Sequence, residues 1–315
     1  MFRVEDRPVP EPSRGEILIR VEAAGVNRAD VLQREGRYPP LPGTPDWPGL
    51  EVAGVVEGVG PHVDAWESGD EVCALLPSGG YAEYAVAQVG LVLPRPPRVS
   101  WEEAASLVEA VCTVWSNLRE AGAKPGETVL IHGGSGGVGT IATQVAASHG
   151  MRVLTTARGP ERAARCLTLG ADVAIDYVEE DFVEVAAREG GVDVILDVLG
   201  GLYLERNLEA LAPGGRLVVL GLQGGAHASL DLGALLAKRA RIIGTTLRAR
   251  PVAQKASIVA DVRENIWPRI PTEIHPVIAA AFPLRDAAAA HVLMESGEAF
   301  GKIVLTTRPE GAAEG

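Results

Sequence analysis

The sequence predicts an α/β protein in which a doubly wound, six-stranded parallel sheet is combined with a β-rich domain. Six short β-rich runs lie between residues 128 and 250, with helix-like stretches between the first five, and a glycine-rich turn follows the first run. Before residue 100, strand-like runs are separated by many turns, and one more such run lies near the C-terminus. We expect one domain at 111–249 and a second built from 1–110 and 250–315.

The first hundred residues alternate between short apolar runs and turns. Residues 16–23 alternate as a half-buried strand, 49–63 form a strand region interrupted by glycines, and 69–72 turn into another short strand. Residues 81–86 predict a further strand. The proline-rich segment 93–97 predicts a connector.

From Trp101 the pattern becomes helical, and from Thr128 strands and helices alternate. Residues 101–118 predict helices, with Ser100 as N-cap and Glu103 completing a capping box. The predicted parallel strands are 129–131, 153–155, 173–175, 192–196, 216–220 and 241–244, with a looser connection into the last. A helix-like stretch follows residue 250, then a run at 271–282, a helix at 284–295 and a strand at 301–305.

The glycine-rich turn directly follows the first parallel strand and opens a helix that runs to 148–149, with Gly150 as its cap. Gly134, Gly136 and Gly139 fit G-x-G-x-x-G, in which two glycines admit a pyrophosphate and the third allows helix and strand to pack. The predicted cofactor-binding residues of this turn are Gly134, Ser135, Gly136, Gly137, Val138 and Gly139. A glycine-rich turn without a ligand is the alternative.

The tip of the next strand distinguishes between the two nicotinamide dinucleotides. An NAD site usually places a carboxylate there for the ribose 2′-hydroxyl, but this chain has Arg158 and, one helical turn on, Arg162. A guanidinium suits a 2′-phosphate, so we infer NADP(H). Glu161 between the two arginines weakens the argument, and an ordinary solvated helix face is the alternative.

Composition excludes several classes of function. A net charge of −12 argues against nucleic acid or anionic membrane as the main partner. No apolar run approaches a membrane span, and the N-terminus lacks the apolar core of a signal peptide, so we expect a cytoplasmic protein. Cys73, Cys112 and Cys166 have no metal-binding spacing and predict buried free thiols.

Several spaced motifs resemble a known family. Gly49-Leu50-Glu51, Ala53-Gly54-Val55-Val56 and Gly69-Asp70-Glu71-Val72 resemble the signature block of the medium-chain dehydrogenases/reductases. Residues 24–30 and Arg37-Tyr38-Pro39 resemble its zinc-independent, zeta-crystallin-like quinone oxidoreductase branch. The resemblance implies a Rossmann domain and a GroES-like catalytic domain. Family members usually begin with one more short strand; here it is shorter, missing or lost to an internal start.

Departures from the zinc alcohol dehydrogenases indicate the branch. Those enzymes have Cys where this chain has Asn27, and Gly-His-Glu where it has Gly49-Leu50-Glu51. Neither a catalytic nor a structural zinc set can be assembled from the sequence, so we expect no metal. Without a Lewis acid, acceptors that take hydride readily, such as quinones or conjugated enones, are favoured.

The resemblance places Asn27, Asp30 and Tyr38 beside the nicotinamide. The Tyr38 hydroxyl and the Asn27 amide are expected to donate hydrogen bonds to a quinone oxygen, while Asp30 orients a neighbour. The alternatives are that Asn27 caps a helix starting at Arg28 and that Tyr38 only packs its loop. Water can also protonate a quinol anion, in which case no dedicated acid exists.

The same resemblance implies further cofactor contacts. Tyr177 and Arg162 would flank the 2′-phosphate, although a surface tyrosine is the alternative. The other implied contacts are Leu220, Gly221, Thr246, Leu247, Arg248, Lys302, Thr113 and Asn117. For Lys302 a solvated position is the alternative.

The sequence therefore predicts an NADPH-dependent, zinc-independent quinone oxidoreductase with hydride transfer in a cleft between its two domains. An NADPH-dependent enone or alkenal reductase and a non-catalytic NADPH-binding protein are the alternatives. The family also implies a homodimer, and the run 240–245 would form the sheet edge through which two copies pair.

Overall fold

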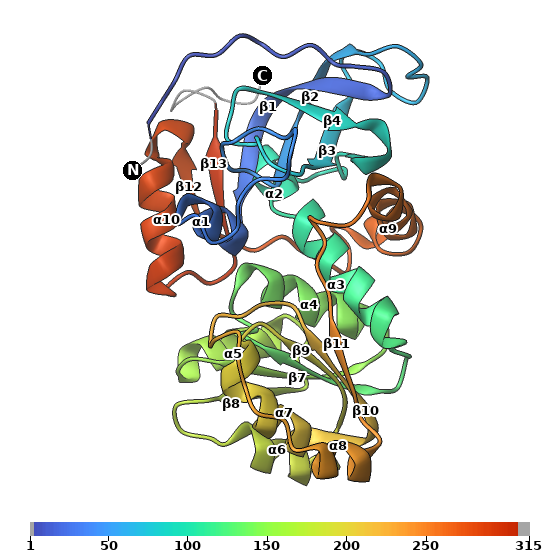
Figure 1. The fold of residues 1–315 in the computed structure, drawn as a ribbon, viewed down its shortest axis with the longest axis vertical. Helices are drawn as coiled ribbons and strands as arrows, with labels where there is room; N and C mark the ends of the chain where they lie inside the picture. The colour runs from blue at the N-terminus through green and yellow to red at the C-terminus, as the bar shows by residue number, and fades with distance from the viewer. Residues whose placement is uncertain (1–2, 308–315) are drawn as a thin grey trace. The chain divides into compact units, whose positions relative to one another are not determined.

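The computed structural model describes residues 3–307, which fall into two compact units (Figure 1). One unit comprises the chain up to Cys112 together with the chain from Arg248 onward, and the other is Thr113–Leu247. The predicted boundaries, 110/111 and 249/250, lie two residues from the observed ones.

The Thr113–Leu247 unit contains a six-stranded sheet whose paired strands are all parallel. Its strands are β6 (Thr128–His132), β7 (Arg152–Ala157), β8 (Val173–Asp176), β9 (Val192–Asp197), β10 (Leu211–Val219) and β11 (Arg241–Gly244). They lie in the order β11-β10-β9-β6-β7-β8. This is the doubly wound order, so the predicted Rossmann sheet is confirmed.

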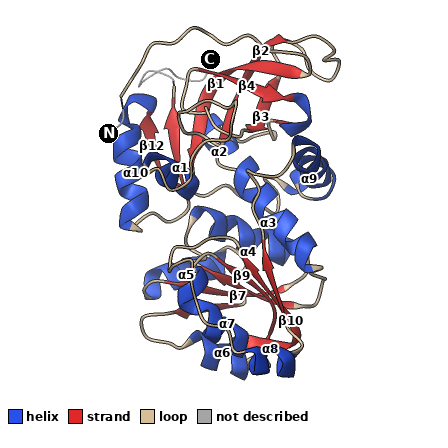
Figure 2. Ribbon diagram, viewed as in Figure 1, coloured by secondary structure: helices blue, strands red, loops and turns tan. Residues whose placement is uncertain are grey.

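Helices follow the strands of this unit in the sequence, and Figure 2 shows these helices in blue and the strands in red. They are α4 (Gly137–Ser148), α5 (Pro160–Thr168), α6 (Phe182–Arg188), the 3₁₀ turn Gly200–Tyr203, α7 (Leu204–Ala210) and α8 (Leu232–Lys238). Gly150 has φ +76° just beyond α4, which confirms the predicted cap. The connection into β11 contains α8, which the sequence did not predict, because its first residues, Leu232 and Gly233, are exposed.

The other unit is β-rich, and its largest element is the strand β1 (Glu16–Val26). Six further strands belong to its sheet: β2 (Glu51–Val59), β3 (Glu71–Leu75), β4 (Tyr84–Gln88), β5 (Val92–Pro94), β12 (Ile278–Pro283) and β13 (Lys302–Thr306). The order is β12-β13-β1-β2-β3-β5, with β4 also paired to β1. The connector predicted at 93–97 was partly wrong: β5 pairs with β3 at the sheet edge, where a terminal proline is tolerated.

Helices lie between the strands of this unit in the sequence, and the helix at Val108–Ala121 runs on into the other unit. They are α1 (Arg28–Arg34), α2 (Trp101–Ala104), α3 (Val108–Ala121), α9 (Val252–Asn265) and α10 (Ala287–Ser296), with 3₁₀ turns at Val89–Leu91, Trp267–Arg269 and Leu284–Asp286. The predicted capping box is confirmed, because Glu103 N donates to Ser100 Oγ (3.2 Å) and Ser100 N to the Glu103 carboxylate (2.7 Å).

Two predictions, about membrane spans and thiols, can be compared with the described residues. Across residues 3–307, no helix is both long and apolar enough to cross a membrane. Cys73, Cys112 and Cys166 are free and buried, as predicted. Burial raises the pKa of the Cys166 thiol to about 11.

Candidate functional site

The three glycines of the β6–α4 turn, at the start of α4, are not all required by the packing of the protein itself. A Cβ on Gly134 would lie 1.8 Å from Thr155 Oγ1, and one on Gly139 would lie 2.0 Å from the Gly133 carbonyl oxygen. Both glycines are therefore required by the packing of the turn itself. A Cβ on Gly136 would meet only the Gly133 oxygen, at an ordinary 3.4 Å. The protein thus leaves space at Gly136 that its own packing does not use, as a closely approaching pyrophosphate requires.

One threonine of the neighbouring strand, Thr156, fixes the start of this turn. Gly134 N donates to the carbonyl oxygen of Thr156 (2.9 Å), and Gly133 N to its hydroxyl oxygen (3.2 Å). The buried His132 contacts the same hydroxyl through Nδ1 (3.2 Å) and Asn207 Oδ1 through Nε2 (2.7 Å). Burial lowers the pKa of His132 to about 4, so the ring is neutral at pH 7 and holds the turn without adding charge.

The second strand ends as the sequence predicts, without a carboxylate. β7 ends at Ala157 and is followed by the exposed Arg158, while Arg162 lies half-buried in the first turn of α5. The exposed Tyr177 follows β8. Asp176, which the sequence analysis did not assign, accepts hydrogen bonds from Gly159 N (2.8 Å) and Val178 N (3.1 Å). It therefore ties the turn that carries both arginines to the tip of β8.

Strand direction collects most of the other predicted cofactor contacts at one edge of the sheet. Because all six strands are parallel, the glycine turn, Leu220-Gly221 after β10 and Thr246-Leu247 after β11 lie beyond the same carboxyl edge. Asn117 is buried and joins α3 to this edge, because it accepts a hydrogen bond from Thr245 and donates one to Thr113 O (2.6 Å). Ligands of doubly wound sheets bind at this edge.

In the β-rich unit, the predicted residues Asn27 and Lys302 meet at a buried carboxylate, Glu51. Lys302 Nζ lies 2.6 Å from both Glu51 Oε1 and Asn27 Oδ1, and Asn27 Nδ2 donates to Glu51 Oε1 (3.0 Å). The second carboxylate oxygen of Glu51 accepts a hydrogen bond from Glu109 N (3.0 Å), at the start of α3. Gly25 is required here, since a Cβ would lie 2.2 Å from the Glu51 carboxylate. Lys302 is not solvated; its side chain is 3% exposed.

Asn27 occupies the N-cap position of α1, which begins at Arg28 as the alternative prediction stated. Asp30 is fully buried, and its carboxylate accepts hydrogen bonds from Asn27 N (2.8 Å), Gly49 N (2.9 Å) and the Tyr81 hydroxyl (3.3 Å). Burial raises the pKa of Asp30 to about 6, partly opposed by the backbone hydrogen bonds from Asn27 and Gly49. Asp30 therefore ties together the start of α1, the Gly49 turn and Tyr81.

Tyr38 lies in the segment after α1 and is held by Arg248. The Arg248 guanidinium carbon lies 3.4 Å from the centroid of the Tyr38 ring. Arg248 Nη2 donates to the carbonyl oxygens of Tyr38 (3.1 Å) and Pro39 (2.7 Å). The sequence predicts Arg248 beside the cofactor, and its described contacts are to Gln33 and to this segment of the β-rich unit.

Several residues of these networks were not predicted. Glu51 was noted only as part of a motif, and nothing near Gln33, Asp176, His132 or Tyr81 marked them as positioning groups. All of these residues except Asp176 act through partners more than 20 residues away in the sequence, so no local pattern indicates them. A glycine was the one sequence signal that could have indicated Glu51, because Gly25 leaves the space that the Glu51 carboxylate fills.

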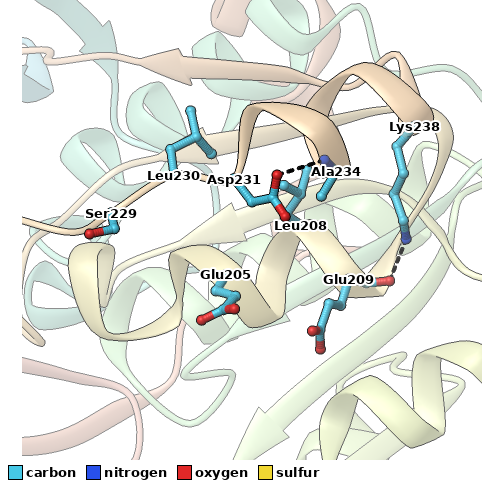
Figure 3. A pocket seen from close by; sticks show the side chains of 8 residues that line it. All are labelled: Glu205, Leu208, Glu209, Ser229, Leu230, Asp231, Ala234 and Lys238. Atoms are coloured by element: carbon cyan, nitrogen blue, oxygen red, sulfur yellow. Dashed lines mark hydrogen bonds between the residues drawn. The ribbon is translucent and has the colours of Figure 1, made fainter.

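A surface pocket beside α7 and α8 is shown in Figure 3. Its lining residues are Glu205, Leu208, Glu209, Ser229, Leu230, Asp231, Ala234 and Lys238. Asp231 caps α8, and the Lys238 ammonium donates to the Glu209 carbonyl oxygen (Figure 3). Three carboxylates line this pocket, so it does not suit a pyrophosphate. None of the predicted site residues lies in it.

Comparison with known proteins gives matches over almost the whole chain. The family described as "Alcohol dehydrogenase GroES-like domain" matches residues 13–97, and the family described as "Zinc-binding dehydrogenase" matches residues 137–260. A quinone oxidoreductase of Mus musculus is 36% identical over 312 residues, which cover 95% of this chain and 92% of that protein. The quinone oxidoreductase of Homo sapiens is 33% identical over 309 residues, with the same coverage.

Solved structures agree with these matches. The quinone oxidoreductase from Thermus thermophilus, solved also in complex with NADPH, is 36% identical with a TM-score of 0.84 and covers 96% of this chain and 95% of its own. The Escherichia coli quinone oxidoreductase complexed with NADPH is 31% identical with a TM-score of 0.85, covering 96% and 94%.

Proposed function

Because the chain belongs to the quinone oxidoreductase family of the medium-chain dehydrogenases/reductases, we propose that it reduces quinones without zinc. It is an oxidoreductase, and NADP(H) is its cofactor. The observation that carries the cofactor assignment in this chain is the open space at Gly136, next to the start of α4. When bound, NADPH supplies the hydride.

The residues of the chain then have separate tasks. The turn after β6 holds the pyrophosphate through the N–H groups that begin α4. Arg158, Arg162 and Tyr177 hold the 2′-phosphate. The Tyr38 hydroxyl donates a hydrogen bond to an acceptor oxygen and stabilises the negative charge that develops there. Asn27 also has a structural role that the sequence did not predict. Its side-chain amide accepts a hydrogen bond from Lys302 and donates one to Glu51, and so links the two buried charges.

Zinc independence is supported by the chemistry of the residues at the expected metal positions. Asn27 and Leu50 stand where the zinc alcohol dehydrogenases have Cys and His. The amide oxygen of Asn27 accepts from the Lys302 ammonium, a cation that would repel a metal ion placed there. The chain itself thus supplies a positive charge beside Asn27. Metal analysis of the active protein is expected to find no zinc, with activity unchanged by a chelator.

Steady-state oxidation of NADPH with a panel of quinones and conjugated enones tests the proposed function. We expect quinones to be the better acceptors, and Tyr38→Phe to lower kcat/KM for quinone by about tenfold, since one hydrogen bond to a charged oxygen is lost. Tyr84→Phe, in β4, is the matched control. Turnover of enones alone would assign the alternative C=C reductase activity, and unchanged quinone turnover in Tyr38→Phe would remove that hydroxyl from the mechanism.

The 2′-phosphate assignment predicts a selective loss of affinity. Arg162→Ala is expected to raise the KM for NADPH by about tenfold, because a charge-assisted hydrogen bond is lost, with little change for NADH. Arg165→Ala, one turn further along α5, is the control. Steady-state rates with each cofactor measure the KM, and fluorescence titrations measure the affinity of the unaltered protein for each. Equal affinity of the unaltered protein for NADPH and NADH would contradict the assignment.

We also propose a homodimer formed through β11. This strand is the last in its sheet, and Ile242 on it is 37% exposed. Pairing with a second copy would satisfy the edge. Light scattering at micromolar concentration is expected to give a dimer, and Ile242→Lys to shift it toward monomer, whereas Val292→Lys on α10 has no effect. A monomer for the unaltered protein would rule the pairing out.

A further inference from the structure

Arg248 holds both the ring and the backbone of Tyr38. Its side chain is buried, with only 6% of the residue exposed. Nη1 donates to Gln33 Oε1 (3.0 Å), and Nη2 donates to the carbonyl oxygens of Tyr38 and Pro39. The guanidinium also stacks on the Tyr38 ring, with 3.4 Å between its carbon and the ring centroid. A single cation therefore controls where the phenol lies.

The segment that follows Tyr38 needs such a partner because of its composition. Prolines stand at 39, 40, 42, 45 and 48, and the structure shows no helix or strand between residues 35 and 50. Proline has no N–H group, so this segment cannot form a regular hydrogen-bonded ladder. The carbonyl oxygens of Tyr38 and Pro39 find their donor in Arg248 instead.

The other end of the segment is tied to the same network. Gln33, which accepts from Arg248, donates to Ser78 Oγ (3.1 Å), and that hydroxyl donates to the carbonyl oxygen of Trp47 (2.5 Å). Trp47 Nε1 in turn donates to Gly79 O (2.9 Å). Arg248 therefore fixes Tyr38, and Ser78 fixes Trp47. The buried Gln33 links these two side chains to each other.

Stability alone does not account for this buried cation. The described partners of Arg248 are amide and carbonyl oxygens and an aromatic face, and Nε has no partner within residues 3–307. Burying a guanidinium without a carboxylate costs free energy, which an apolar side chain of similar volume would avoid. A buried guanidinium at this place is explained if its task is to fix the position of Tyr38.

Arg248 is itself anchored where the chain re-enters the β-rich unit. It is the first residue after Leu247, the last residue of the parallel-sheet unit. Its carbonyl oxygen accepts from Lys255 Nζ (3.3 Å), a side chain of α9 that is also buried. The backbone that carries the guanidinium is therefore fixed by α9, so the cation can act as a clamp rather than follow the segment.

We propose that Arg248 is a positioning residue for the acceptor, not a cofactor contact: it clamps the 38–47 segment and orients the Tyr38 hydroxyl toward a quinone oxygen. This inference rests on the proposed function of Tyr38. It also assigns a task to Gln33 and Ser78, which hold the far end of the segment. The sequence resemblance had placed Arg248 beside the cofactor, and the two assignments predict opposite effects of its removal.

Arg248→Met tests the clamp, since methionine removes the charge and every donor. We expect the KM for quinone to rise by about tenfold and NADPH affinity to stay within about twofold. Arg248→Lys retains the positive charge but lacks the planar, paired N–H donors of the guanidinium, and it gives a second variant if the first does not fold. Arg263→Met, at an exposed position on α9, is the control. In a Tyr38→Leu background, Arg248→Met should add less than about twofold.

Hydrogen exchange separates this inference from the proposed function. The amide hydrogens of residues 41, 43, 44, 46 and 47 are expected to exchange faster in Arg248→Met and Arg248→Lys than in the unaltered protein and Arg263→Met. If the unaltered protein reduces no quinone, the proposed function fails while exchange still tests the clamp. Unchanged exchange in both variants would overturn the clamp. A fall in NADPH affinity with an unchanged KM for quinone would overturn it too, and would return Arg248 to the cofactor.

Discussion

Replacing Lys302 with methionine is expected to lower the free energy of unfolding of the β-rich unit by about 3–5 kcal/mol. The ammonium lies 2.6 Å from Glu51 Oε1, and the two side chains are 3% and 0% exposed. Without Lys302, the Glu51 carboxylate stays buried with hydrogen bonds only from Asn27 and Glu109 N. The cost therefore comes from a charge left without its partner, more than from the lost contact itself.

Urea unfolding followed by tryptophan fluorescence measures this loss in the relevant unit. Four of the five tryptophans, at 47, 66, 101 and 267, belong to the β-rich unit. In the double variant Lys302→Met/Glu51→Gln no charge remains, so we expect a smaller loss than the sum of the single variants. Arg269→Met, which breaks an exposed pair with Glu273, should cost no more than about 0.5 kcal/mol.

The same variants decide between two roles for Lys302. The sequence resemblance placed it near the cofactor, whereas its described contacts are to Asn27 and Glu51. A structural role predicts reduced stability with NADPH affinity unchanged at temperatures where the variant is folded. Unchanged stability together with weak NADPH binding would instead support the cofactor role and contradict the buried ion pair as a source of stability.

The parallel-sheet unit could be predicted almost completely, because its signals are local. Each of its strands is a short β-rich run, and the glycine turn follows the first of them directly. Parallel pairing then brings the strand ends to one edge without further information from the sequence. The six predicted strands are confirmed for this reason, whereas α8 was missed because its short, exposed first turn shows no clear helical periodicity.

The buried networks of the β-rich unit could not be predicted, because their members lie far apart in the sequence. Lys302 and Glu51 are 251 residues apart, and Arg248 and Tyr38 are 210 apart. Side chains so distant meet only after the sheet has formed, and their residue types are those of an ordinary solvated surface. The sequence named Arg248 and Lys302 only as cofactor contacts, and it did not indicate that Arg248 contacts Tyr38 or that Lys302 contacts Asn27.

Replacing Gly136 with alanine is expected to weaken NADPH binding by about a hundredfold, or roughly 3 kcal/mol, while leaving the fold intact. Gly136 has φ −79° and ψ 171°, extended backbone that alanine adopts without strain. Its added Cβ would meet only the Gly133 oxygen at 3.4 Å, so the protein itself has room for the methyl group. The pyrophosphate does not, because this is the glycine at which the phosphate approaches the backbone.

The neighbouring glycines make this prediction discriminating. Gly134→Ala places a Cβ 1.8 Å from Thr155 Oγ1, so we expect it to lower stability and binding together. Gly58→Ala, in open space on β2, should change neither. Calorimetric titration with NADPH and thermal unfolding, measured on all three variants, separate a lost ligand contact from a distorted turn. If Gly136→Ala binds NADPH as tightly as the unaltered protein, the open space at Gly136 does not hold the pyrophosphate, and the structural support for the cofactor assignment is removed.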